Sequence, residues 1–227
     1  MARRRHPRGE CVFCGRVLTR GGLVGHLQAC PERAAAIAKA DAGPGRAQRI
    51  FHLQVEDAWG GDFWLHLEMN GAATMESLDD YLRAIWLECC GHLSTYYIGE
   101  AWHGEEVGMG RRAVAVLRPG MELIHLYDFG TTSETTVKVV GWRQGKPLTQ
   151  HPIYLMARNN MPEVKCAVCG EPATYLCTEC MYDEDARDVF CDAHSETHGC
   201  DIEYRMPIVN SPRVGMCGYS GPAEPPY

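Results

Sequence analysis

Residues 166–200 read CAVCGEPATYLCTECMYDEDARDVFCDAHSETHGC, and this stretch decides how the C-terminal part of the chain folds. It holds eight cysteine and histidine side chains in 35 residues, as two Cys-x-x-Cys hooks followed by Cys-x-x-His and His-x-Cys. Zinc prefers four nitrogen or sulfur ligands in a tetrahedron, so eight ligands suit two closed structural sites. The predicted zinc ligands are Cys166, Cys169, Cys177, Cys180, Cys191, His194, His198 and Cys200.

The order of these motifs leaves two ways to share the ions. Consecutive motifs could bind one ion, or alternate motifs could do so. Only seven residues separate the first two hooks, well below the about 15–20 residues of a usual zinc ribbon. We therefore expect the interleaved, cross-brace arrangement, which resembles B-box-type zinc modules. Its two ligand sets are Cys166, Cys169, Cys191 and His194, and Cys177, Cys180, His198 and Cys200.

The alternative to zinc is a disulfide framework or a set of buried free thiols. The Arg-rich N-terminus has no apolar stretch behind it, which is unlike a signal peptide. We therefore expect reduced thiols and a cytoplasmic location, where this ligand spacing is typical of metal sites. The longest clean apolar run, Ala113–Leu117, is far too short to cross a bilayer, so we expect no membrane contact.

A further metal motif opens the chain. Cys11 and Cys14 form a hook, and His26 and Cys30 follow after eleven residues. The last two lie four residues apart, which places them on one face of a short helix. The motif resembles the ββα zinc finger with cysteine as its last ligand, although glycines between 21 and 25 weaken the helix. We predict a third zinc ion at Cys11, Cys14, His26 and Cys30.

Charge is unevenly distributed along the chain. Residues 1–49 carry ten basic and three acidic side chains, a net charge of +7, whereas residues 50–227 have a net charge of −14. A basic arm can bind phosphates, while an acidic body repels them. The alternative for the arm is a solvated tail. The side chains expected to contact nucleic acid are Arg3, Arg4, Arg5, Arg8 and Arg20.

The middle of the chain carries the pattern of an α+β domain. Residues 63–69 alternate apolar and polar side chains, which predicts a strand with one buried face, paired with a strand over residues 50–57. Thr74 can cap a helix that runs to about Cys90. We expect a mostly antiparallel sheet with one packing helix. Further strands are predicted at Ser94–Ile98, Met121–Tyr127, Thr135–Val140 and Ile153–Ala157.

These signals divide the chain into five parts. The finger and basic arm occupy residues 1–32 and a linker follows over 33–49. The central α+β domain takes residues 50–160 and the two-zinc cross-brace module takes 161–205. An extended tail completes the chain over 206–227, and we expect its last residues, Pro222–Tyr227, to fray.

Three motifs of the central domain and tail resemble one known family. They are Tyr127–Gly130 with the following Thr131–Val140, the Phe63–Asn70 strand with the helix from Thr74, and Asn210–Arg213 with Cys217–Tyr219. Together they resemble the plasmid pRiA4b ORF-3-like family, whose members are also labelled transposon passenger proteins. The resemblance covers roughly residues 50–220. It implies a fold and implies little about activity.

Glu88, Cys89, Cys90 and His92 gather at the end of the predicted helix. A Cys–His pair there could supply a nucleophile and its base. The same residues could begin a fourth metal site, or Cys89 could simply pack in the core. No complete catalytic set is visible in the sequence, so we identify no catalytic residue.

We predict a non-enzymatic zinc-binding protein that associates with nucleic acid through its N-terminal basic finger. One alternative is a protein–protein adaptor that uses the C-terminal zinc module. The other is an enzyme with a site near Glu88–His92 and Asp128.

Overall fold

The computed structural model describes residues 7–183 and 186–227 and shows an α+β fold dominated by antiparallel sheet. The strands are β1 (Arg8–Cys11), β2 (Val17–Thr19), β3 (Gln48–Asp57), β4 (Trp64–Asn70), β5 (Ser94–Ile98), β6 (Glu105–Val107), β7 (Glu122–Tyr127), β8 (Ser133–Gly145), β9 (Ile153–Asn159), β10 (Tyr175–Cys177), β11 (Val189–Phe190) and β12 (Arg205–Pro207). The helices are α1 (Arg20–Ala29), α2 (Pro31–Ala42), α3 (Met75–Leu82), α4 (Ala113–Val116) and α5 (Asp192–Glu196). Shorter turns are the π-helical η1 (Arg83–Leu87) and the 3-10 turns η2 (Cys180–Tyr182), η3 (Ile202–Tyr204) and η4 (Met216–Gly218).

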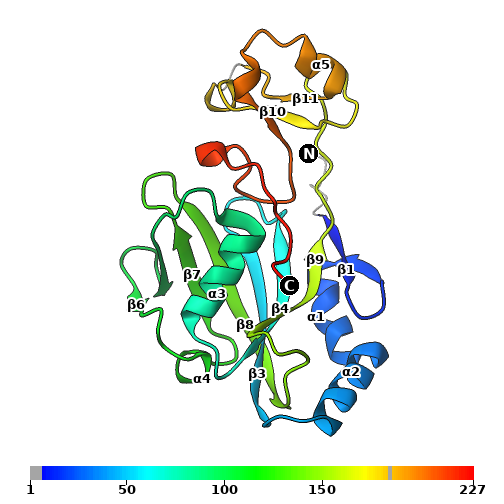
Figure 1. Cartoon of the computed structure of the whole chain (residues 1–227), viewed down its shortest axis with the longest axis vertical. Helices are drawn as coiled ribbons and strands as arrows, with labels where there is room; N and C mark the ends of the chain where they lie inside the picture. The colour runs from blue at the N-terminus through cyan, green and yellow to red at the C-terminus, as the bar shows by residue number, and fades with distance from the viewer. Residues whose placement is uncertain (1–6, 184–185) are drawn as a thin grey trace.

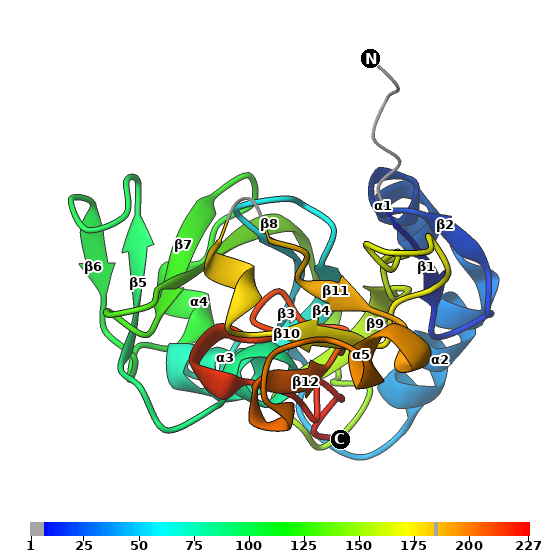
Figure 2. The same ribbon diagram turned by 90° about the horizontal axis from the view of Figure 1, so that it is seen from above.

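One sheet of nine strands organises most of the chain. Its order is β2-β1-β9-β4-β3-β8-β7-β5-β6, and every neighbouring pair is antiparallel. Figure 2 shows its end strands β6 and β2 on opposite sides of the molecule. A separate three-stranded sheet, β11-β10-β12, forms the C-terminal module at the top of Figure 1.

The predicted hairpin and helix start are confirmed in the central domain. Strands β3 and β4 pair from Ile50 opposite Asn70 to Glu56 opposite Trp64. The Asp57 carboxylate accepts backbone N–H bonds from Gly60 and Phe63, which closes the connecting turn. Helix α3 begins as expected, because the Thr74 hydroxyl accepts a hydrogen bond from the Ser77 N–H.

The predicted helix is shorter than expected at its C-terminal end. Regular α-helix stops at Leu82, a π-helical turn continues to Leu87, and Glu88 is already extended. The Glu88 side chain accepts a hydrogen bond from the Gly91 N–H, and Gly91 has a φ of 73°. The left-handed conformation that suits glycine therefore lies in the loop beyond the helix.

The expectation that only one face of β4 is buried is wrong. Trp64, His66 and Glu68, predicted to face solvent, are 0%, 0% and 3% exposed. The reason is that the N-terminal finger packs on this side of the sheet, where Leu23 and Leu27 of α1 join Trp64 in a second core cluster. The main core, on the other face, lies beneath α3 and η1.

Buried polar groups tie the finger to the sheet. His52 Nε2 lies 3.0 Å from His66 Nδ1, and His66 Nε2 lies 3.2 Å from the Arg20 carbonyl oxygen. Burial lowers the pKa of His52 to about 3 and that of His66 to about 4, so both rings are neutral at pH 7. A neutral chain fits this geometry, with His52 donating to His66 and His66 donating to Arg20. Nearby, Arg33 of α2 pairs with the buried Glu68.

The tail returns from the C-terminal module to the central sheet (Figure 1). Arg213 is fully buried and its guanidinium lies 2.6 Å from Asp128 Oδ2, while the Ser211 hydroxyl donates to the Trp86 carbonyl. The predicted fraying of Pro222–Tyr227 is wrong, because Tyr227 stacks on His151 at 4.0 Å and Ala223 is buried. Across the described part of the chain, no helix combines the length and the apolar character needed to cross a membrane.

Candidate metal centres

The N-terminal finger brings its four predicted ligands together. Cys11 ends β1, Cys14 lies in the following turn, His26 is on α1 and Cys30 ends that helix. Cys14 Sγ is 3.3 Å from His26 Nε2, and all four ligand atoms lie within 4.8 Å of one another. Burial raises the pKa of the Cys11 thiol to about 11. A bound cation would favour the thiolate there, since metal binding displaces thiol protons.

The finger is built into the central sheet. Strand β1 pairs with β9, and Gly9 sits so close that a Cβ there would lie 2.1 Å from the Arg158 carbonyl oxygen. The finger helix forms despite its glycines, because Thr19 caps it and Leu23 and Leu27 are buried against the body. Packing on the sheet thus supports a finger that has a weak helix of its own.

The C-terminal module groups its eight ligands in the interleaved order. At one cluster Cys169 and Cys191 sulfurs are 3.8 Å apart and Cys191 Sγ is 3.2 Å from His194 Nδ1. At the other, Cys180 Sγ is 3.7 Å from Cys200 Sγ and 3.4 Å from His198 Nε2. The two sets, each with ligand atoms within 4.8 Å of one another, are Cys166, Cys169, Cys191 and His194, and Cys177, Cys180, His198 and Cys200.

Local backbone favours the thiolate at one hook cysteine of the module, whereas neighbouring thiols oppose it at another. Burial opposes ionisation of Cys166, yet backbone N–H groups of Cys191, Cys169 and Val168 lower its pKa to about 6. In the second cluster, burial and the neighbouring thiols of Cys177 and Cys200 raise the pKa of Cys180 to about 12. Several thiolates repel one another, and a divalent cation among them removes that repulsion. Each set could therefore hold a metal ion.

A fourth cluster joins residues far apart in the chain. Cys89, Cys90 and His92 follow η1, and Cys217 reaches them from η4 in the tail. All twelve cysteines of the chain now fall into four clusters, each with three cysteines and one histidine. Sequence reasoning offered Cys89, Cys90 and His92 as one possible start of a fourth metal site, but did not connect Cys217 with them. Each of the three predicted ligand sets contains three cysteines, and three further cysteines remained. That equal number was the signal in the sequence that could have indicated a fourth set.

The same region holds the residues of the enzyme alternative, Glu88–His92 and Asp128. His92 Nε2 is 2.9 Å from Cys90 Sγ and 3.4 Å from Asp128 Oδ2, so both partners approach the same ring nitrogen. A nucleophile–base–acid triad needs them on opposite nitrogens. Moreover, neighbouring thiols raise the pKa of Cys90 to about 12, so the thiol beside His92 carries little thiolate. Burial opposes ionisation of Cys89, yet hydrogen bonding to Arg213 lowers its pKa, so the thiolate is favoured at the cysteine beside Arg213. The arrangement resembles a ligand set more than a catalytic triad.

The structure describes only two of the five arginines predicted to contact nucleic acid, Arg8 and Arg20. Arg3, Arg4 and Arg5 lie outside the described residues. Arg8 is exposed and donates a hydrogen bond to the Val17 carbonyl, whereas Arg20 forms an ion pair with Glu56. The structure also shows a basic groove that the sequence reasoning missed. It is lined by Arg46, Ala47, Gln48, Arg49, Gly71, Ala72, Arg112 and Val114.

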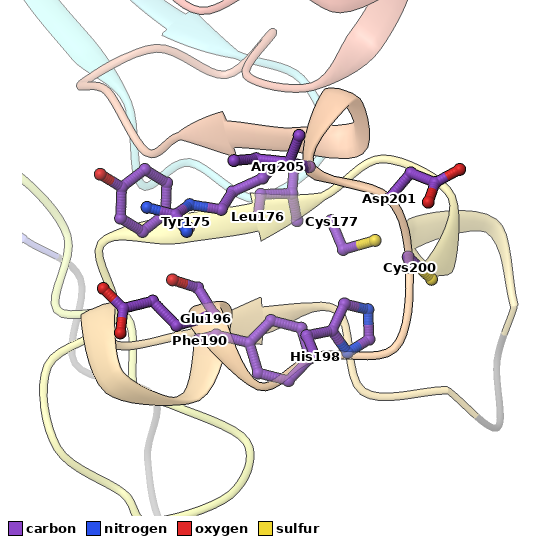
Figure 3. Close-up of a pocket in the computed structure, with 11 residues that line it drawn as sticks. Tyr175, Leu176, Cys177, Phe190, Glu196, His198, Cys200, Asp201 and Arg205 are labelled. Atoms are coloured by element: carbon purple, nitrogen blue, oxygen red, sulfur yellow. The ribbon is translucent and has the colours of Figure 1, made fainter.

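A pocket in the C-terminal module lies next to the second cluster (Figure 3). Tyr175 and Leu176 of β10 form one wall and Phe190 of β11 forms the other, while Cys177, His198 and Cys200 sit at one end. The Arg205 guanidinium stacks 4.1 Å over the Tyr175 ring. The pocket therefore shares Cys177, His198 and Cys200 with the second candidate metal cluster.

Comparison with known proteins adds little. No protein-family model matches the chain, and no curated protein matches it. The chain is similar to the crystal structure of the protein of unknown function MM3350 from Methanosarcina mazei Go1, with 15% sequence identity and a TM-score of 0.40. The matched region covers 48% of this chain and 67% of the MM3350 chain. A likeness of this strength indicates no function.

Proposed function

We propose that the chain is a non-enzymatic zinc-binding protein that associates with nucleic acid through its positive N-terminal segment, residues 1–49. Zinc is the favoured ion because each cluster offers three sulfurs and one imidazole, a donor set that suits tetrahedral zinc and does not suit magnesium or calcium. Four protein ligands fill a tetrahedron, so zinc in the finger and the C-terminal module would be structural.

The contrast in charge carries the nucleic-acid proposal. The segment has a net charge of +7 on a chain whose remainder has −14. Some of its basic groups are neutralised by the body, as in the Arg20–Glu56 and Arg33–Glu68 pairs. Within the described ranges, Arg16 and Arg46 have no acidic partner, so their charge remains available to phosphates.

The basic groove supplies a structured place for a phosphate backbone. None of its eight lining residues is acidic, and three of them are arginines, Arg46, Arg49 and Arg112. The Arg49 guanidinium lies 4.5 Å from the centre of the Trp142 ring, and residue Trp142 is 47% exposed. An exposed aromatic ring beside arginines is the combination that binds single-stranded nucleic acid by stacking and charge.

Sequence preference should be weak. The exposed positions of α1 include Gly21, Gly22, Gly25 and Ala29, which carry no side chain that can read a base edge. Gln28 is the exposed exception on this helix. Contacts to phosphates fix affinity and position, whereas contacts to base edges fix sequence choice.

The test is a fluorescence titration of labelled single-stranded and duplex DNA and RNA at several salt concentrations. With about four phosphates contacted, the slope of log affinity against log salt should be about −3.6 for duplex DNA. Deleting residues 1–6 removes three arginines but spares β1, and it should make the slope shallower by about 2.7. Absence of binding at micromolar protein and low salt would reject the proposal.

A matched pair of variants tests the groove. Arg46→Glu combined with Arg112→Glu reverses two charges that line it and should weaken binding strongly. Lys138→Glu combined with Lys165→Glu reverses two exposed charges elsewhere and serves as the control. If both double variants lose the same binding affinity, net charge alone explains binding and the groove is not the binding site.

One observation favours a protein adaptor as the second candidate. Beside the pocket of the C-terminal module, Ile202 is 80% exposed, and Tyr182 of the same module is 70% exposed. An exposed apolar side chain that lines a pocket, as Ile202 does, is a possible anchor point for a protein partner. If nucleic acid fails to bind and Ile202→Glu abolishes a reproducible protein complex that Lys165→Glu preserves, the adaptor role replaces the first proposal.

A further inference from the structure

The fourth cluster lies where the tail meets the end of the central helix. Cys89, Cys90 and His92 come from the loop that follows η1, and Cys217 comes from the turn η4. At least 125 residues of chain separate Cys217 from the other three. The cluster is therefore created by the docking of the tail and has no counterpart in a local sequence motif.

Its dimensions are close to those of a tetrahedral zinc site. Bond lengths of about 2.3 Å to sulfur and 2.0 Å to nitrogen place two sulfurs about 3.8 Å apart and a sulfur and a nitrogen about 3.5 Å apart. Three of the observed separations agree: 3.6 Å for both Cys89–Cys90 and Cys90–Cys217, and 3.4 Å between His92 Nε2 and Cys217 Sγ. The fourth, 2.9 Å between Cys90 Sγ and His92 Nε2, is shorter than in a zinc complex, so these two side chains would move apart to admit the ion. Cys180 and its partners in the C-terminal module show 3.7 Å and 3.4 Å.

The surrounding structure holds the ligands in place without zinc. In the tail, Ser211 donates to the Trp86 carbonyl and Arg213 pairs with Asp128. These two contacts anchor the tail on the central domain just before the turn that carries Cys217. Cys217 has a φ of 50°, an uncommon backbone conformation that occurs between Gly215 and Gly218. This conformation belongs to the turn that brings the Cys217 sulfur to the cluster.

A hydrogen-bond donor also faces the cluster. Arg213 Nη2 lies 3.5 Å from Cys89 Sγ, whereas the Tyr127 hydroxyl, 3.7 Å from the same sulfur, donates its hydrogen to Glu88 Oε1. Three thiolates and a neutral imidazole leave a zinc complex with one net negative charge. Donors directed at a thiolate stabilise that charge and orient the ligand.

We propose that Cys89, Cys90, His92 and Cys217 bind a fourth zinc ion, which joins the C-terminal tail to the end of the central helix. The three sulfurs and one nitrogen form the same donor set as in the finger and both C-terminal clusters. Unlike those sites, this one fastens two distant parts of the chain that are already packed together. Its loss should loosen the turn that carries Cys217, while the Ser211 and Arg213 contacts keep the preceding part of the tail docked and the other three clusters stay intact.

Native mass spectrometry of the full-length, reduced, zinc-loaded protein tests the proposal. The wild-type chain should carry four zinc ions and Cys217→Ser should carry three. Met216→Ser changes the neighbouring residue of the same turn, which is not in the cluster, and should keep four. His92→Asn removes a ligand from the central domain's side and should also leave three, even if the tail of Cys217→Ser no longer docks.

Two results would overturn the fourth site. One is an equal number of zinc ions in wild type, Cys217→Ser and His92→Asn. The other is a wild-type chain whose mass, under denaturing and non-reducing conditions, is about two hydrogens below that of the fully reduced chain, together with no loss of zinc from either variant. That second result would identify a Cys90–Cys217 disulfide in place of a metal site, since their sulfurs are the closest pair across the tail contact at 3.6 Å.

Discussion

Replacing Arg213 with methionine should destabilise the central domain strongly. The Arg213 side chain is completely buried, and its guanidinium lies 2.6 Å from Asp128 Oδ2. It also donates to the Thr131 carbonyl and the Ser133 hydroxyl, both at 2.9 Å. Methionine fills a similar volume but leaves the Asp128 carboxylate buried without its cation.

The expected magnitude follows from that geometry. Removing one partner of a buried ion pair costs about 3–5 kcal/mol, because the remaining charge is left uncompensated. Asp128→Asn should cost a similar amount, since it keeps the shape and removes the charge. The double variant should be less destabilised than the sum of the two single variants, by about 1–3 kcal/mol, because neither charge is then left unpaired.

Urea unfolding followed by tryptophan fluorescence measures these differences. Trp86 is a suitable reporter because it is buried and its carbonyl accepts the Ser211 hydroxyl of the docked tail. Lys138→Met, at an exposed position of β8, controls for the loss of a positive charge. An Arg213→Met protein within about 0.5 kcal/mol of wild type would refute the reasoning, since surface changes have effects of that size.

Two further outcomes follow from buried groups and from metal. Stability should fall as the pH drops below about 6.5, because His52 and His66 have folded pKa values of about 3 and about 4 and the unfolded chain binds their protons first. Each histidine contributes about 1.4 kcal/mol per pH unit to the slope of the free energy of unfolding against pH in that window. Urea unfolding of His52→Gln should therefore show a shallower pH dependence than wild type. An unchanged slope would contradict the buried neutral pair. Cys177→Ser should unfold residues 166–200 and leave the central transition in place, because zinc supplies roughly 10–16 kcal/mol per structural site in finger peptides. Limited proteolysis checks this, and a module that stays resistant after chelation would argue against metal-dependent folding.

Local patterns in the sequence were enough for much of the fold. Alternation over residues 63–69 predicted β4, and Thr74 marked the start of α3, because period and capping depend on near neighbours. The seven-residue gap between the first two hooks favoured the interleaved grouping that the structure shows. A gap that short leaves little chain for folding both hooks onto one ion.

Contacts between distant segments could not be predicted in the same way. The polar face of β4 contains His66 and Glu68, which resembles a solvated face until α1 covers it. Trp64 on that face was a hint, since a large apolar ring among polar residues is unusual for an exposed strand. The finger was therefore expected as a separate unit, although its hairpin extends the central sheet.

The fourth cluster could be only partly predicted, for a related reason. Cys217 lies in a segment without periodicity, and no local spacing links it to Cys89 and Cys90. Its position depends on Arg213 reaching Asp128, a buried ion pair across 85 residues of chain. Counting cysteines could have suggested the set, but only the folded tail places Cys217 beside His92.

Anomalous scattering at the zinc absorption edge, measured on crystals of the full-length protein, tests the interleaved zinc sites most directly. The account predicts one peak within the finger and two within the C-terminal module. Of these two, one should be surrounded by Cys166, Cys169, Cys191 and His194, and the other by Cys177, Cys180, His198 and Cys200. A single peak enclosed by the four cysteines of the first two hooks, or no peak in the module, would contradict it.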